Sequence, residues 1–121
     1  MATELIAVSG VNHPYDAYLD VRGNGTVSKT TLESVSPGAF LIDYSDIQKI
    51  EEWSRENAPP KDADGVPTGS VLVYCVSGTR ATFTAGILQG TGDWKQVHFL
   101  ITSNPRETPG WKIVREFLKG N

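Results

Sequence analysis

The sequence predicts an α+β fold in which a mostly antiparallel sheet packs against one principal helix. Three observations lead to this prediction: strand-like patterns near the N-terminus, one amphipathic helical pattern at 46–57, and three strand-like segments within 70–102. The chain has 121 residues, of which 39% are hydrophobic and 21% are charged. This composition is typical of a globular protein, and the length fits one domain.

Two short strands are expected in the N-terminal segment 1–28. The first is Leu5–Val8. The second is Tyr15–Val21, in which every other residue is apolar, as in a strand with one buried face. Gly23–Gly25 predicts a tight turn, because glycine tolerates positive φ. This segment is expected to link to, or complete, the sheet of a domain that spans 29–121.

The segment 46–57 has the clearest helical pattern in the chain. Ser45 can cap the first free amides, and Gln48, three residues later, completes a capping box. The helix ends before Pro59, because the residue that precedes a proline is pushed out of the helical region. A short apolar strand is expected just before the helix, at Ala39–Ile42. The apolar stripe of the helix consists of Ile47, Ile50 and Trp53.

Three strand candidates follow in close succession, at Ser70–Val76, Ala81–Leu88 and Lys95–Thr102. The links between them are short and contain glycine. Such links favour antiparallel neighbours, because a parallel crossover needs about a dozen residues or more. The sequence therefore predicts a three-strand meander over 70–102. The last segment, Trp111–Leu118, fits either a helical stripe or an alternating edge strand, and the strand is preferred.

Residues Val71–Val76 are apolar without alternation, which predicts a strand that is covered on both faces. One helix covers only one face of a sheet. The other face would have to be covered by the N-terminal strands or by a second copy of the chain. The second alternative predicts an oligomer.

No residues have the spacing of a catalytic or metal site. Cys75 is the only cysteine, which excludes an intrachain disulfide, and its apolar neighbours favour a small buried hydrophobic residue over a nucleophile. His13 and His98 lack nearby ligands and are interpreted as structural or solvated. Asp62–Gly65 lacks the final carboxylate of a calcium loop and is interpreted as a polar turn. We therefore expect no catalytic residue, no metal and no cofactor.

Charge and hydropathy argue against further classes of protein. The net charge of −3 disfavours nucleic-acid binding, which needs a basic surface. No apolar stretch approaches the ~18 residues of a membrane span, so no membrane insertion is expected. Residues 1–4 lack the basic and apolar regions of a secretory signal. Synthesis in a cytoplasm and expression as a fragment both remain open.

Five short motifs follow one another between residues 29 and 121. They are an apolar entry with a Pro-Gly turn at Leu32–Ile42, an N-x-P-P element at Asn57–Pro60, a glycine-led strand at Gly69–Tyr74, a strand ending in glutamine at Ile87–Gln89, and a closing segment at Trp111–Glu116. In order and spacing they resemble the knob domain of R-type pyocin and phage tail fibres, whose closing motif is W-S-x-W-R-E. Two positions depart from that pattern: Val114 stands where the family has its second closing tryptophan, and Ile101 where it often has an arginine.

The resemblance implies a non-enzymatic virion protein, made in the host cytoplasm and located at the tail fibre or tail tip. It would act in host-surface recognition and attachment. The implied partners are two further copies of the chain in a homotrimer, other tail proteins and a bacterial surface glycan. The alternative is a purely structural virion protein, such as a capsid decoration or a fibre connector. A small carbohydrate-active enzyme would need a pair of carboxylates across a cleft, which the sequence does not place.

The resemblance leaves the ligand site to be chosen by residue type. Aromatic faces and polar side chains hold sugars, and binding groups concentrate in loops at strand ends. The residues with these properties, and hence the predicted ligand-binding set, are Asp93, Trp94, Asn104 and Arg106.

Overall fold

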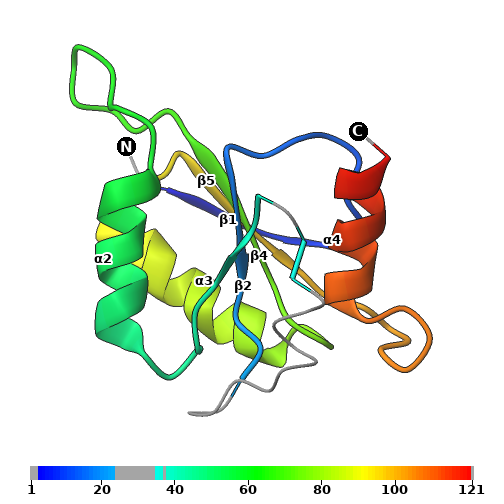
Figure 1. Cartoon of the computed structure of the whole chain (residues 1–121). Helices are drawn as coiled ribbons and strands as arrows, with labels where there is room; N and C mark the ends of the chain where they lie inside the picture. The colour runs from blue at the N-terminus through cyan, green and yellow to red at the C-terminus, as the bar shows by residue number, and fades with distance from the viewer. Residues whose placement is uncertain (1–2, 24–34, 37, 121) are drawn as a thin grey trace.

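The computed structural model describes residues 3–23, 35–36 and 38–120, and in this part of the chain it shows an α/β fold on a five-stranded sheet (Figure 1). The elements are, in chain order, β1 (Glu4–Val8), β2 (Ala17–Asp20), β3 (Phe40–Leu41), α2 (Ile47–Asn57), β4 (Ser70–Tyr74), α3 (Thr79–Thr91), β5 (Gln96–Leu100) and α4 (Gly110–Lys119). The strand order is β1-β5-β4-β2-β3, and every pair is parallel. The predicted α+β class with a mostly antiparallel sheet and one principal helix is therefore wrong.

The error begins at Ala81–Leu88, which lies in helix α3 and not in a strand. Threonine and glycine are frequent there, and their low helix propensity weakens the helical pattern of the sequence. The helix has 13 residues and supplies the crossover that the parallel β4–β5 pair requires. The link at 77–80 therefore leads from a strand into a helix and is not a hairpin turn. The buried residues of α3 do have helical spacing: they are Ala81, Thr84, Ala85 and Leu88.

The segment Trp111–Leu118 lies in helix α4, so the preferred edge strand is wrong and the helical alternative is confirmed. Both neighbours of β5 in the sheet are already taken, by β1 and β4. The segment packs instead on a face of the sheet, where the fully buried Val114 meets Leu100 and Tyr74.

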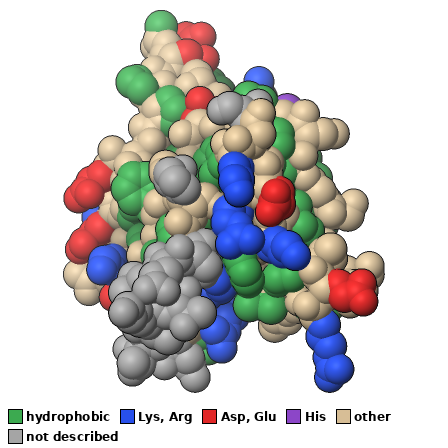
Figure 2. Space-filling model, turned by 45° about the vertical axis from the view of Figure 1, so that its right-hand side comes forward, with side chains coloured by type: hydrophobic (Ala, Val, Ile, Leu, Met, Phe, Trp, Pro, Cys, Tyr) green, Lys and Arg blue, Asp and Glu red, His purple; other side chains and the backbone are tan. Residues whose placement is uncertain are grey.

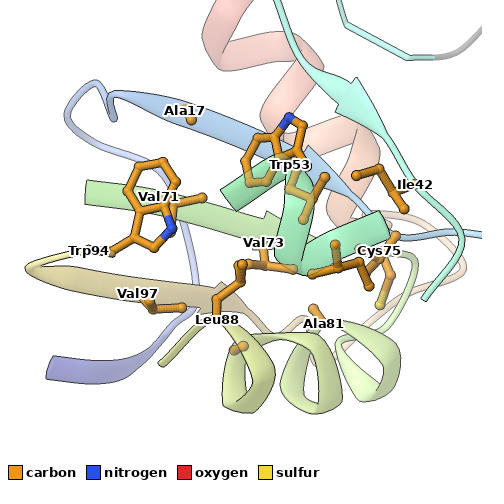
Figure 3. Close-up of a cluster of buried hydrophobic side chains, with 14 residues drawn as sticks. Ala17, Ile42, Trp53, Val71, Val73, Cys75, Ala81, Leu88, Trp94 and Val97 are labelled. Carbon is orange, nitrogen blue, oxygen red and sulfur yellow. The ribbon is translucent and has the colours of Figure 1, made fainter. Parts of the chain in front are cut away.

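Helices cover both faces of the sheet. On one face, Trp53 of α2 and Leu88 of α3 pack in one cluster with Val73 (Figure 3). On the other face, Val114 of α4 packs in a cluster with Leu72. The prediction of cover on both faces is confirmed for residues 71–75, whereas Val76 is exposed, and the chain provides the cover itself. A second copy is not needed for this purpose, and the homotrimer stays a prediction.

The helix predicted at 46–57 is confirmed as α2, although its cap differs. The side chain of Asp46, and not that of Ser45, accepts a hydrogen bond from the amide of Lys49, at 3.2 Å. The hydroxyl of Ser45 donates to Asp43 instead.

The two N-terminal strand candidates are confirmed as β1 and β2, which pair with β5 and β4 respectively. Gly23 has a φ of 115°. The rest of the predicted turn, Asn24–Gly25, and the predicted domain boundary after residue 28 lie outside the described residues. Within the part of the chain that the structure describes, no helix has the length and apolar character needed to cross a membrane.

Candidate functional site

A cavity of about 540 Å³ opens at the edge of the sheet where the parallel strands end. Arg22 follows β2, Tyr44 follows β3, and the segment Cys75–Arg80 follows β4. The chain leaves β2 toward β3 and leaves β4 toward β5, in opposite directions along the sheet. Loops that diverge in this way open a crevice, and open α/β sheets bind their ligands there. The position of the cavity therefore marks it as the candidate site.

Cys75 lies between the last residue of β4 and the three residues that precede α3. We call the segment from Cys75 to Arg80 the cysteine loop. The side chain of Cys75 is 3% exposed, lines the cavity, and stands beside the first turn of α3 (Figure 3). The amide of Gly78 donates a hydrogen bond to its Sγ, at 3.2 Å. The loop thus holds one sulfur atom at the base of the cavity with a backbone donor directed at it.

The carbonyl oxygens of the cysteine loop are bound by residues that do not line the cavity. Those of Cys75, Val76 and Ser77 accept from the amides of Trp111 (3.0 Å), Gly110 (2.8 Å) and Thr102 (3.0 Å). In a planar trans peptide the N–H points opposite to the C=O. The amides of residues 76, 77 and 78 therefore face away from these partners. That of Gly78 donates to the sulfur, and those of 76 and 77 have no acceptor among the described residues.

The first turn of α3 adds to this set of donors. Its amides have no acceptor inside the helix, and the helix dipole places partial positive charge at this end. Together with the amides of the cysteine loop, they form a concave site that favours a negative charge on or next to Cys75.

Arg22 approaches the cavity from β2 and is held on two sides. Its guanidinium pairs with the fully buried Asp20, with Nη2 2.7 Å from Oδ2, and lies 5.0 Å from the centre of the Trp111 ring. Burial raises the pKa of Asp20, and the hydrogen bonds and charge of Arg22 oppose that rise. Arg115 also lies over the Trp111 ring, 5.0 Å from its centre. Figure 2, with the α4 side turned forward, shows Lys and Arg side chains gathered beside hydrophobic ones.

Arg80 approaches the cavity from the start of α3. Its guanidinium lies 4.8 Å from the centre of the Tyr44 ring and donates to the carbonyl of Gly23, at 3.0 Å. Tyr44 in turn meets Phe83 edge to face, with ring centroids 6.2 Å apart. No carboxylate among the described residues pairs with Arg80. The described residues that line the cavity include two arginines and no Asp, Glu or His.

Comparisons with known proteins identify the fold. No family model matches the chain, and no curated protein matches it. A Helicobacter pylori protein solved by NMR aligns with a TM-score of 0.54 and 23% identity, over 85% of this chain and 81% of that one. This likeness shows a shared fold.

Two further structures align less well. One is a Rhodopseudomonas palustris protein of unknown function, described as a possible tyrosine phosphatase, with a TM-score of 0.47, 19% identity, and coverage of 75% of this chain and 65% of that one. The other is a rhodanese homologue from Thermus thermophilus, with a TM-score of 0.40, 18% identity, and coverage of 74% and 80%. At TM-scores below 0.5, these two likenesses carry no weight for fold or function.

The resemblance to phage tail-fibre knobs is wrong. The sheet is all parallel, and the fold is shared with a bacterial protein and not with a tail knob. Segments matched to the knob strands, such as Ile87–Gln89, lie in a helix. Three predictions depended on that resemblance or on its fold, and they are wrong as well. They are the function in host attachment, the alternative as a structural virion protein, and the location in the virion.

The structure does not bring the four predicted ligand residues together. Asp93 and Trp94 precede β5, whereas Asn104 and Arg106 follow it, so a strand of about 15 Å separates the two pairs. Trp94 is fully buried, its Nε1 donates to Ser54 at 2.8 Å, and its ring has no face open to a sugar. The hydroxyl of Ser54 donates to Asp93. These contacts are structural.

Asn104 and Arg106 lie exposed in the loop between β5 and α4. The carbonyl of Asn104 accepts from the amide of Thr108 at 2.8 Å, which closes a local turn. Neither residue lines the cavity next to Cys75. Their role as ligand contacts stays a prediction.

Sequence reasoning missed Cys75 as a site residue, although a signal was present. Three residues after Cys75 comes Gly78, with a φ of 124°, and two residues later comes Arg80. A strand, a glycine-containing loop and a helix in direct succession place a loop at a helix N-terminus. Because α3 was predicted as a strand, the same residues were interpreted as a hairpin turn.

His98 has structural surroundings, whereas His13 is exposed and its Nδ1 lies 2.8 Å from Oδ1 of Asn12. His98 is 7% exposed, and a hydrogen bond of 2.7 Å joins its Nδ1 to the hydroxyl of Tyr15. Burial and the neighbouring His13 lower the pKa of His98, and Glu4 partly opposes this. At the turn Asp62–Gly65, Oδ1 of Asp62 accepts hydrogen bonds from the amides of Asp64 and Val66, each at 2.9 Å. In the described ranges, no three His, Cys, Asp or Glu side chains are grouped to hold a metal.

Proposed function

We propose that the chain is a sulfurtransferase in which Cys75 holds the transferred sulfur as a persulfide. The observation that supports this most directly is the cysteine loop, which presents one buried sulfur to a cavity with amides and two arginines around it. A thiolate is the nucleophilic form of cysteine, and a persulfide is likewise an anion. Both are stabilised by backbone N–H groups and a helix N-terminus.

The reaction has two steps. In the first, the Cys75 thiolate attacks the outer sulfur of a donor such as thiosulfate. A bond forms between the two sulfur atoms, the bond from the outer sulfur to the sulfonate breaks, and sulfite leaves with the electron pair. In the second, an acceptor such as cyanide attacks the outer sulfur of the persulfide, thiocyanate leaves, and the Cys75 thiolate is restored. No redox partner is needed in either step.

The cavity lining favours sulfur transfer over hydrolysis of a phosphate ester. A cysteine that cleaves a phosphate ester needs an acid to protonate the leaving oxygen. The described residues that line the cavity include no Asp, Glu or His for this role. Sulfite leaves as a stable anion and needs no proton. The residues therefore suit a donor whose leaving group is already an acceptable anion.

The test measures thiocyanate formation from thiosulfate and cyanide, together with the mass of the intact protein after the donor alone. We expect the wild type to form thiocyanate and to gain the mass of one sulfur atom. Cys75→Ser is expected to lose the adduct and to lower the rate by a factor on the order of 10³ or more. Cys75 is the only cysteine, so an adduct identifies it without mapping.

Circular dichroism of Cys75→Ser controls for folding. The proposal is wrong if the folded wild type gives neither adduct nor thiocyanate with any sulfane donor, or if it hydrolyses para-nitrophenyl phosphate in a manner that depends on Cys75.

A further inference from the structure

The cavity beside Cys75 is much larger than one inorganic anion requires. Its volume of about 540 Å³ lies within the range of roughly 300–1,000 Å³ that holds organic ligands. Thiosulfate would occupy only the end of the cavity next to the sulfur. The remaining space has room for a larger ligand, and its walls indicate which kind.

Apolar side chains form those walls. Phe83 on α3 is 51% exposed and Val76 in the cysteine loop is 43% exposed, and both line the cavity. Phe83 also contacts the Tyr44 ring edge to face. Exposed aromatic surface next to a reactive group is typical of a ligand site, because burying it against an apolar ligand is favourable.

The cations stand close to this apolar wall. Arg80 lies over the same Tyr44 ring, and no described carboxylate neutralises it, whereas Arg22 is already paired with Asp20. The cavity thus offers one uncompensated positive charge, backbone donors around Cys75, and an aromatic wall. A ligand that satisfies all three has an anionic head and an apolar body.

We infer that the sulfur donor is an organic thiosulfonate, with an aryl or alkyl body against Tyr44 and Phe83 and its sulfur-bearing head at Cys75. This inference rests on the sulfurtransferase function proposed above. The Cys75 thiolate attacks the terminal sulfur of the thiosulfonate, and a sulfur–sulfur bond forms. The bond between the terminal sulfur and the sulfonyl sulfur breaks, and the sulfinate leaves with the electron pair. The charge is the same before and after the step.

The first experiment measures kcat/KM for thiocyanate formation with benzenethiosulfonate, methanethiosulfonate and thiosulfate. We expect the wild type to prefer benzenethiosulfonate over each of the other two by about tenfold, since aromatic contacts of this kind contribute on the order of 1 kcal/mol. Phe83→Ala is expected to remove most of the preference for the benzene over the methane compound. Phe40→Ala is the matched control, because Phe40 is 44% exposed and does not line the cavity.

The second experiment does not depend on turnover. Calorimetric titration with benzenesulfonate and methanesulfonate, which hold no transferable sulfur, is expected to show tighter binding of the benzene compound to the wild type and to Phe40→Ala, and a smaller difference in Phe83→Ala. Equal binding of the two sulfonates, or a thiosulfate kcat/KM as high as that of benzenethiosulfonate, overturns the donor assignment alone. Absence of transfer from all three donors overturns the sulfurtransferase function and the donor assignment with it.

Discussion

Asp20 and Arg22 show how single residues set the charge of the site. Asp20 is fully buried and accepts both from the side chain of Arg22 and from its backbone amide, at 3.0 Å. Burial of a carboxylate is unfavourable unless it is paired, and the raised pKa of Asp20 reflects that cost. The pair holds the guanidinium between Asp20 and Trp111, at the wall of the cavity.

A double-mutant cycle tests this pair. Asp20→Asn leaves a buried guanidinium with a weaker acceptor, and Arg22→Met leaves a buried carboxylate without its cation. We expect each single variant to lower the free energy of unfolding by about 3 kcal/mol. The double variant is expected to lose about 2 kcal/mol less than the sum of the two, because both charges are gone. Urea denaturation at neutral pH measures all three, and strict additivity would show that the pair is not coupled.

The residues of the site were harder to predict than those of the core. Trp53 was expected in the core and lies there, since an apolar residue on a helical stripe has few alternatives. Cys75 was also expected to be buried, and it is, but burial did not distinguish a packing residue from a sulfur at the base of a cavity. That distinction depends on Arg22 and Tyr44, which are far away in sequence and line the same cavity as Cys75 only because of the strand order.

Among the elements, the cysteine loop depends most on its glycine. Gly78 has a φ of 124°, which side chains rarely adopt, and a Cβ added there would lie 2.9 Å from the carbonyl oxygen of Leu100. The loop is thus pressed against the end of β5, and its conformation directs the Gly78 amide to the sulfur.

We expect Gly78→Ala to lower the free energy of unfolding by about 2 kcal/mol or more, from backbone strain and the close contact, and to reduce sulfur transfer more than stability alone explains. The matched control is Gly86→Ala in α3, where a Cβ meets nothing within 4 Å. That substitution is expected to raise stability by about 1 kcal/mol, because alanine favours helix over glycine. Thermal and urea denaturation measure both, and equal effects of the two substitutions would contradict the strain argument.

At this scale, the sequence identified strands more reliably than it identified their connections. β1, β2, β4 and β5 all lie within segments that the sequence predicted as strands, from apolar runs or, for β2, from alternating apolar residues. Helix α3 was predicted as a strand because Thr82, Phe83 and Thr84 favour strands locally, although its buried residues have helical spacing. Because this segment was predicted as a strand, the short link before it was interpreted as a hairpin. A hairpin joins antiparallel strands, so the parallel strand order could not be predicted. One local error thus changed the predicted topology of the whole sheet.

For the whole molecule, the two faces of the sheet are covered unequally. Two helices cover one face, whereas the other is covered by α4 and by the segment before β2 that includes His13 and Tyr15. His98 on β5 lies under this segment, bonded to Tyr15, and its Nε2 is buried without a partner among the described residues. A proton on His98 would place a charge in this buried layer, close to the His13 ring at a centroid distance of 6.1 Å.

The stability of the whole fold should therefore depend on pH. The folded state lowers the pKa of His98 below its unfolded value of about 6.5, so the unfolded chain binds this proton first as the pH falls. The stability contributed by neutral His98 is complete above pH 6.5 or so and is lost as the pH falls from there through the lowered pKa. Urea denaturation at several pH values from 7.5 to 5 is expected to show this loss in the wild type.

His98→Gln, which keeps a polar group near Tyr15, is expected to show a smaller loss. His13→Gln should show an intermediate one, since removing that neighbour lets the pKa of His98 rise toward its unfolded value. A loss in His98→Gln as steep as in the wild type would assign the pH dependence to other groups.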